Sequence, residues 1–220
     1  MSVMTMDIDW APDVVIEYTL SLLEKYGVKC TIFATHKTDA LLFCNRDLFE
    51  IGIHPNILNA IDCNDVVEEL LSIYPEAKGV RSHGLVQGSK ICNQFANHGL
   101  EYVSNYLIPY YVKPFKLWNG MYQVPYNWED DVHLMYGYSY DIIDIIDIID
   151  TSQFNIFNFH PIHIYLNTDI LERYEEAKND IDNLESYRNK KEKGIEDFFT
   201  MLLENKQQPY NKMVETINGE

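Results

Sequence analysis

The sequence predicts an α/β domain built on a parallel β-sheet, either open or closed into a barrel. Short apolar runs rich in β-branched and aromatic residues alternate with amphipathic segments of helical period. The connections between these segments are short, as in β–α–β units. No glycine- or serine-rich linker and no internal repeat interrupts the 220 residues, so we expect a single domain over residues 1–220.

The first half of the chain shows the alternation most clearly. Residues 3–8 are expected to form the first strand, and residues 13–26 an amphipathic helix that stops at Gly27. The elements expected next are strands at 28–35 and 50–53, a helix at 64–74, a strand at 79–81, a helix at 89–97 and a strand at 100–103. Strands that alternate with helices in this way favour parallel pairing.

The second half is less regular. Residues 105–128 contain several prolines and aromatics with little helical period, which favours a strand pair or long loops. The repeat DIIDIIDIID at 141–150 predicts a short helix with a solvated acidic edge. A late strand is expected at 154–160, FNIFNFH. Residues 168–220 are polar and charged, and predict a C-terminal helical part with helices at 169–188 and 193–205.

Composition and charge exclude several classes of function. The formal net charge of −17 repels phosphate backbones, so no nucleic-acid partner is expected. The N-terminus lacks a basic and apolar leader, and no run approaches the roughly 20 apolar residues that span a bilayer. We therefore expect no membrane insertion and a cytoplasmic location. The four cysteines have no CxxC spacing, which argues against a zinc ribbon or a disulfide framework. None of these features predicts an oligomeric state.

Polar residues follow the apolar strands at the edge where parallel α/β sheets gather their active residues. The first cluster contains Asp7 and Asp9. Alternation along a strand would place both carboxylates on one face, about 6.5 Å apart along the backbone. Because two carboxylates so close repel each other, a cation or an arginine is expected to keep both ionised. The alternative is that Asp9 caps the following helix.

Three further clusters bring histidine and arginine to the same edge. His54 follows an apolar strand and precedes a proline, a position that suits a cleft as well as a satisfied polar residue. Arg81 and His83 would alternate onto one side of the next strand, where Arg81 can pair with a carboxylate and His83 can ligate a metal ion. His160 ends the late strand and can donate a proton to a leaving group. His163 is expected behind the site or, more simply, on the surface.

Together these clusters supply what metal-assisted hydrolysis needs. They offer one carboxylate and two imidazoles for a metal ion, a spare carboxylate as base, an arginine beside it and a histidine as acid. One carboxylate with two imidazoles suits Zn²⁺, and Co²⁺, Ni²⁺, Mn²⁺ or Fe²⁺ can occupy the same ligands. We expect one divalent metal ion, with Zn²⁺ as the first candidate.

In their order along the chain, these motifs resemble those of the polysaccharide deacetylases, also known as carbohydrate esterase family 4 or the NodB-homology group. The resemblance covers residues 5–167. TMDIDW resembles the opening motif, which implies that Asp7 is the catalytic base and Asp9 a metal ligand. GIHPN resembles the second motif, which implies that His54 binds the metal ion.

Two later motifs and one loose match extend the resemblance. Arg81 in GVRSH matches the arginine that contacts the base, and His160 in FNFHP matches the general acid. The match at residues 127–131, NWEDD, is looser, and implies that Trp128 walls the cleft and that Asp130 orients His160.

The chain departs from the family pattern at Leu58, where the usual second motif has another histidine. We expect His83 to supply that imidazole. This pattern resembles a shorter branch of the superfamily associated with lipopolysaccharide and capsule gene clusters.

The resemblance implies both a fold and a reaction. The fold is a distorted (β/α)₇ barrel. The reaction removes an acyl group, usually acetyl, from an N-acylated or sometimes O-acylated sugar. Asp7 would take a proton from water on the metal ion, the cation would stabilise the oxyanion, and His160 would protonate the departing amine. A cytoplasmic protein would act on a nucleotide-linked or lipid-linked sugar.

Two other interpretations account for part of the pattern. A haloacid-dehalogenase-like phosphatase also opens with DxD after an apolar strand and holds Mg²⁺ on both carboxylates, but it gives the histidines no task. A non-catalytic, carbohydrate-binding relative without a metal ion is favoured by Leu58. The metal content of the purified protein separates this relative from the hydrolase.

Overall fold

A computed structural model describes residues 2–58, 60, 62–110, 112–138, 154–204 and 209–219. The helix expected at 141–150 lies outside these residues. The strands are β1 Ser2–Asp7, β2 Cys30–Ala34, β3 Phe49–Ile53, β4 Gly79–Val80, β5 Tyr102–Val103, β6 Phe115–Lys116, β7 Tyr122–Gln123, β8 Trp128–Glu129, β9 Asn155–Phe159 and β10 Tyr210–Asn211. The α-helices are α1 Asp13–Tyr26, α2 Asp39–Leu42, α3 Cys63–Ile73, α4 Ser89–Asn97, α5 Asp130–Met135, α7 Pro161–Leu166, α8 Leu171–Lys178, α9 Ile195–Glu204 and α10 Met213–Asn218.

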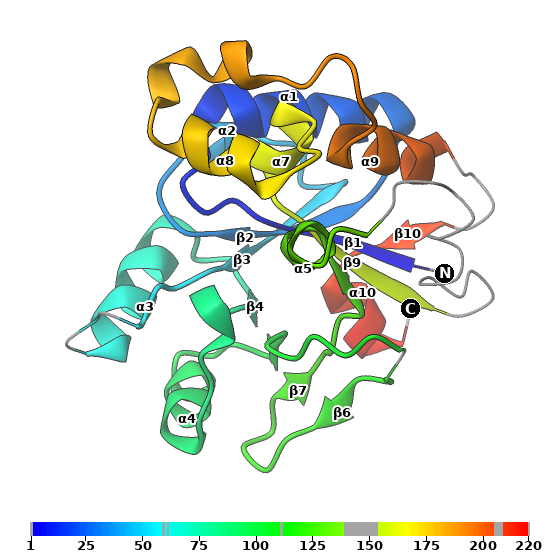
Figure 1. Cartoon of the computed structure of the whole chain (residues 1–220). Coiled ribbons are helices and arrows are strands. Elements are labelled where there is room, and N and C mark those ends of the chain that lie inside the picture. The colour runs from blue at the N-terminus through cyan, green and yellow to red at the C-terminus, as the bar shows by residue number, and fades with distance from the viewer. Residues whose placement is uncertain are drawn as a thin grey trace.

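The strands form one curled, mostly parallel sheet. Their order is β6-β7-β5-β4-β3-β2-β1-β9-β8, and β10 pairs with the start of β1. Only the β6–β7 pair is antiparallel among the described strands, which confirms the strand pair expected within residues 105–128. Figure 1 shows the sheet curving from β9 and β1 through β4 to β7 and β6, with α1, α7, α8 and α9 packed over its outer side. The expected parallel α/β architecture is confirmed.

Strand alternation decides which side chains face the inside of the curl. On β1, Met4 and Met6 join the large core beneath the outer helices. Val3 belongs instead to a smaller inner core that α10 completes with Met213. Thr5 and Asp7 share the parity of Val3 and therefore lie on the same inner face. The inner face thus changes from apolar to polar toward the carboxyl end of the strand.

The curl brings its strands close enough to require glycine on the inner face. A Cβ atom added to Gly79 would lie 2.0 Å from the ring of Tyr102. No side chain fits that space, so Gly79 allows β4 and β5 to pair while the Tyr102 ring fills the interior. This close approach positions Arg81, two residues later, within the same interior.

The C-terminal part differs from its prediction in two respects. The helix expected over 169–188 is broken: α8 ends at Lys178, and a distorted 3₁₀ segment, η2 Ile181–Tyr187, follows. The tail is not purely helical either, because β10 joins the sheet beside β1. Among the described residues, none of the helices has the length and apolar character needed to cross a membrane.

Candidate active site

Arg81 lies at the centre of a buried polar network at the carboxyl end of the inner face. Its side chain is fully buried, and its guanidinium carbon lies 4.5 Å from the centre of the Phe33 ring and 4.4 Å from that of Tyr126. Its Nε donates to the carbonyl oxygen of Ser104 at 3.0 Å, and its Nη2 donates to the hydroxyl oxygen of the same residue at 3.0 Å. These contacts with neutral groups fix the position and direction of the guanidinium independently of its ion pair.

The remaining guanidinium nitrogen holds Asp7 and Asn158. Arg81 Nη1 donates to Asp7 Oδ1 at 3.1 Å, to Thr5 Oγ1 at 3.1 Å and to Asn158 Oδ1. Asn158 Nδ2 donates to Asp7 Oδ2 at 2.9 Å, so each oxygen of the Asp7 carboxylate has a donor. We call Arg81, Asp7, Asn158, Thr5 and Ser104 the Arg81 network. It holds the Asp7 carboxylate in one orientation and supplies the positive charge that its burial demands.

Next to this network, Asp9, His54 and His83 bring three potential metal ligands together. Asp9 Oδ1 lies 3.4 Å from His54 Nε2 and 3.2 Å from His83 Nδ1, and the two imidazole nitrogens are 3.3 Å apart. We call these three residues the Asp9 triangle. Its sides are nearly equal, and ligands 2.0–2.1 Å from a tetrahedral ion lie about 3.3–3.4 Å apart. The triangle therefore fits one face of a tetrahedral site whose remaining position is open.

The backbone reaches this arrangement differently from the prediction. β1 ends at Asp7, and Asp9 lies in the following turn with a φ of 43°, a left-handed conformation that aspartate tolerates. It does not cap α1, whose N-cap is Pro12. β4 ends at Val80, so His83 is not on a strand face with Arg81 but in the short 3₁₀ segment η1 His83–Leu85. The turns, and not strand alternation, bring these side chains to one site.

The electrostatics of the triangle favour a bound cation. Burial raises the pKa of Asp9, but hydrogen bonds from His54 and His83 outweigh it and hold that pKa far below its usual range. The hydrogen bond to Asp9 raises the pKa of His83. His54 is buried, and its Nδ1 has no hydrogen-bond partner among the described residues, with Asp7 Oδ1 3.6 Å away. Two imidazoles facing one ionised carboxylate form a donor set typical of Zn²⁺ and related ions.

His160 lies on the other side of Asp9, held by Asp130. Its Nδ1 donates to Asp130 Oδ1 at 2.6 Å, and its backbone N–H donates to Asp130 Oδ2 at 2.6 Å. His160 Nε2 points to the site, 3.8 Å from Asp9 Oδ2. Burial opposes the charged imidazolium, yet Asp130, Asp131 and Asp9 hold the pKa of His160 well above its usual value. The structure therefore places Asp130 where the resemblance implied that it would orient His160.

His163 is not on the surface, contrary to the simpler expectation. It is almost fully buried, because β9 leads directly into α7 through Pro161 and turns this histidine inward. His163 Nε2 lies 2.7 Å from Asp131 Oδ1, and the other oxygen of Asp131 lies 3.8 Å from His160 Nε2. His163 thus positions the Asp131 carboxylate beside His160 Nε2.

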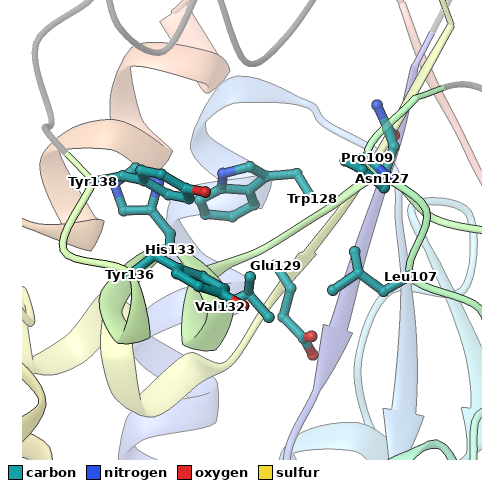
Figure 2. Close-up of a pocket in the computed structure, with 9 residues that line it drawn as sticks. All are labelled: Leu107, Pro109, Asn127, Trp128, Glu129, Val132, His133, Tyr136 and Tyr138. Atoms are coloured by element: carbon teal, nitrogen blue, oxygen red, sulfur yellow. The ribbon is translucent and has the colours of Figure 1, made fainter.

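Two pockets adjoin these groups. One, with a volume of about 410 Å³, opens over the Asp9 triangle and is lined by Asp9, Trp10, Thr35, His36, Asn56, His83, Tyr174 and Lys178. The other, which we call the aromatic pocket, has a volume of about 530 Å³ and is lined by Leu107, Pro109, Asn127, Trp128, Glu129, Val132, His133, Tyr136 and Tyr138. Figure 2 shows its aromatic rings on one side and Leu107 and Pro109 opposite, with the Glu129 carboxylate at one edge. The indole of Trp128 walls this pocket, as the resemblance implied.

The structure adds residues that sequence reasoning missed. Asn158 and Glu129 are the most important, because Asn158 Nδ2 donates to both Asp7 Oδ2 and Glu129 Oε1, the latter at 3.1 Å. Acceptor atoms of Asp7, Glu129 and His160 lie within 4.8 Å of one another. Burial raises the pKa of Glu129. One signal was available: Asn158 is a polar residue inside an apolar strand, two positions before His160 and hence on the same face.

Comparison with known proteins identifies a family model that matches residues 4–178. Its description is WbmS-like polysaccharide deacetylase. A search of curated proteins finds no match.

Solved structures extend the comparison. A protein of Bordetella bronchiseptica, described as a candidate polysaccharide deacetylase involved in O-antigen biosynthesis, is 36% identical with a TM-score of 0.81, over 92% of this chain and 89% of that one. A candidate polysaccharide deacetylase from Mycobacterium smegmatis is 14% identical with a TM-score of 0.64, over 99% and 88%. A family 4 acetyl xylan esterase from Clostridium thermocellum, solved with a cobalt ion, is 14% identical with a TM-score of 0.54, over 99% and 90%. These likenesses confirm the predicted barrel-type fold of carbohydrate esterase family 4.

Proposed function

This chain belongs to the WbmS-like polysaccharide deacetylase family, and we propose that it is a metal-dependent hydrolase that removes an acyl group, first of all N-acetyl, from a sugar. The observation that carries the proposal is that a paired base and a paired acid both adjoin the Asp9 triangle. Asp7, held by Arg81 and Asn158, lies 3.6 Å from His54 Nδ1, and His160 Nε2, whose ring is held by Asp130, lies 3.8 Å from Asp9 Oδ2.

Asp9, His54 and His83 are the residues that would hold the metal ion. A divalent ion there supplies Lewis acidity, which polarises the acyl carbonyl and makes water more acidic. Zn²⁺ is the first candidate, and Co²⁺ is the next, since a family 4 relative was solved with cobalt. Leu58, which replaces the usual second histidine, is 59% exposed, and His83 offers its imidazole in the triangle instead.

Asp7 is the general base of the proposed reaction. Arg81 and Asn158 each donate a hydrogen bond to one oxygen of its carboxylate and fix its orientation. A carboxylate oxygen has about two acceptor sites, so each oxygen can accept a further hydrogen bond. Asp7 would accept a proton from the water that attacks the acyl carbon. A base held in place by its neighbours loses no free energy to reorientation during the reaction.

His160 is the general acid. Asp130 accepts a hydrogen bond from Nδ1–H, so the second proton of the imidazolium lies on Nε2, which faces the site. The carboxylates around the ring favour the protonated imidazolium, the form that can donate to the departing amine. Protonation of the amine allows the carbon–nitrogen bond to break and releases the acyl group as a carboxylate.

The proposed substrate is an N-acylated sugar of O-antigen or related surface-polysaccharide biosynthesis, since the Bordetella bronchiseptica relative is described as acting in O-antigen biosynthesis. If the protein works in the cytoplasm, as its sequence predicts, that sugar is linked to a nucleotide or a lipid carrier.

The proposal is tested by measuring acetate release from N-acetylated amino sugars by protein reconstituted with Zn²⁺ or Co²⁺. We expect turnover by the wild type and its loss in Asp7→Asn and in protein stripped by a chelator. Arg46→Met, which changes a surface ion pair with Glu76, is the matched control and should remain active. An absence of metal binding would reject the mechanism and favour the non-catalytic relative, and stoichiometric metal without acetate release from any sugar would reject the deacetylase reaction.

A further inference from the structure

The aromatic pocket is continuous with the catalytic groups through one residue, Glu129. Its Oε1 accepts from Asn158 Nδ2, which also holds Asp7. Its carboxylate lies within 4.8 Å of acceptor atoms of both Asp7 and His160. Glu129 also lines the pocket, so a ligand in the pocket that contacts this carboxylate lies close to the acid and the base of the proposed reaction.

Glu129 is the carboxylate that the pocket offers to a ligand as a hydrogen-bond acceptor. Its two oxygens accept from Asn158 Nδ2 and from the Tyr126 hydroxyl, at 3.1 Å and 3.2 Å. A carboxylate has about four acceptor sites, so about two remain. The side-chain amide of Asn127, also in the lining, is already engaged, because it donates to Asn155 Oδ1 at 2.7 Å and accepts from the backbone N–H of Ile156 at 2.6 Å.

The remaining lining is a set of aromatic faces. Trp128 and His133 have ring centres 5.6 Å apart, and His133 and Tyr138 also 5.6 Å. Tyr136 stacks on Tyr138 with ring centres 5.7 Å apart and planes at 26°. Tyr136 is 67% exposed and Tyr138 is 45% exposed, so a large area of ring surface faces outward beside the pocket. Ligand sites are commonly built from such rings with a few convergent polar groups.

These observations exclude two kinds of occupant. A phosphate group would face the carboxylate of Glu129 with no lysine or arginine among the described lining residues. A long acyl chain would cover the remaining acceptor sites of that carboxylate with hydrocarbon and offer them no donor, which is costly. A sugar ring satisfies both parts of the lining, because it presents C–H surface to the aromatic rings and hydroxyl donors to Glu129.

We propose that the aromatic pocket binds the sugar ring of the substrate, with Glu129 accepting hydrogen bonds from its hydroxyl groups and the tyrosine pair stacking on its apolar face. This inference rests on the proposed function. It also orients the substrate: the amine stays with the sugar on the His160 side, and the acyl group lies toward the Asp9 triangle. The volume of about 530 Å³ exceeds what an acetyl group alone needs and suits a ring with substituents.

The test uses probes that need no turnover. Binding of glucosamine and galactosamine to the metal-loaded wild type is followed by saturation-transfer NMR, with N-ethylacetamide as the ring-free probe. We expect saturation to be transferred from the protein to the ring protons of at least one amino sugar, and little saturation to be transferred to the amide. Tyr136→Ala and Glu129→Gln should each raise Kd about tenfold. Tyr136→Phe, which keeps the ring, should bind as the wild type does. Trp118→Ala removes an aromatic of similar exposure, 65%, outside the pocket and is the matched control.

Kinetics separates this inference from the proposed function. With an N-acetylated sugar, Tyr136→Ala should raise KM about tenfold with kcat nearly unchanged, because it weakens binding of a part that does not react. Sugar binding without turnover of any N-acetylated sugar would reject the deacetylase and keep the pocket. Equal Kd values for the wild type and Tyr136→Ala would overturn the pocket assignment. So would the absence of saturation transfer from the protein to the ring protons of either amino sugar.

Discussion

Two groups of charged side chains lie next to each other at the carboxyl end of the sheet and differ in how their charge is balanced. In the Arg81 network, a buried guanidinium meets one carboxylate, and its other donors reach a carbonyl, two hydroxyls and an amide oxygen. In the Asp9 triangle, three potential ligand atoms face one another at 3.2–3.4 Å, and the positive charge that its own members can supply is a proton on a histidine.

In the first group the protein itself balances the buried charge, whereas in the second group a bound ligand would balance it. The Arg81 network is satisfied by the chain itself, so its cost of burial is offset within the protein. The Asp9 triangle lies beside a pocket, is less deeply buried at His83, and contains a carboxylate whose charge only a protonated histidine of the triangle can balance until a cation binds. Changes in the first group should therefore act on stability, and changes in the second should act on metal binding.

The largest expected effect is on the stability of Arg81→Met. Removing the guanidinium leaves Asp7 buried without its counter-charge, and breaking such a pair costs about 3–5 kcal/mol. Urea denaturation followed by circular dichroism measures the loss. Arg46→Met breaks the exposed ion pair with Glu76 and should cost less than about 1 kcal/mol. If Arg81→Met were as stable as Arg46→Met, the network would not be part of what holds the fold together.

This contrast also explains how much of the fold could be predicted. The bounds of α1 and α4 coincide with the prediction, because their apolar period is clear and α1 stops at Gly27, which adopts the left-handed conformation with φ 65°. The helix α7 was missed because PIHIYL is buried on almost every side and shows no amphipathic period. The strands β8 and β10, of two residues each, were missed because tertiary pairing, and not local sequence, defines them.

The site was predictable as a set of strand ends and not as a geometry. Asp7, His54, Arg81 and His160 follow apolar strands, and parallel strands end at one edge. The side chains that hold these residues come from distant parts of the sequence. Asn158, for example, donates to Asp7 from a strand 151 residues away. The turn that brings Asp9 to His83 depends on a left-handed residue that no local pattern indicated. Such partners are decided by the packed structure.

The next expected effect separates the acid from the metal ligands. His160→Gln should lower kcat about 100- to 10,000-fold, since it removes the proton donor. Its metal content should be unchanged, because His160 is paired with Asp130 and is not part of the Asp9 triangle. Acetate release and elemental analysis measure the two quantities. His98→Gln, at a histidine bonded to Asn64 outside the site, serves as control. Loss of metal from His160→Gln would show that His160 takes part in metal binding, contrary to its assignment as the acid.

A smaller effect is expected when metal stabilises the fold through the Asp9 triangle. At a free Zn²⁺ concentration 100 times its Kd, the ion should add about 2.7 kcal/mol to the free energy of unfolding. For a chain of this length that shifts Tm upward by about 5–10 °C. Differential scanning fluorimetry of chelator-treated and reconstituted protein measures the shift. Asp9→Ala and His54→Ala should unfold at the same Tm with and without Zn²⁺. An equal shift in these variants would place the ion elsewhere.

The smallest effect concerns Glu50, a buried carboxylate balanced by hydrogen bonds instead of an adjacent arginine. It accepts from the hydroxyls of Thr31 and Tyr102, both at 2.8 Å, and from the backbone N–H of Val214 at 3.1 Å. Burial raises the pKa of Glu50 above its usual value, so the folded state favours the protonated form. Stability from this group is therefore present below the unfolded pKa of about 4.5 and is lost as pH rises through the folded pKa.

Glu50→Gln can keep its oxygen toward Thr31 and turn its amide toward Tyr102, and it carries no charge at any pH. The free energy of unfolding of the variant should therefore rise relative to that of the wild type between pH 4 and pH 7. Urea titrations across that range measure the difference, and parallel curves for the two proteins would show that hydrogen bonds alone stabilise an ionised Glu50 as well as an adjacent guanidinium would.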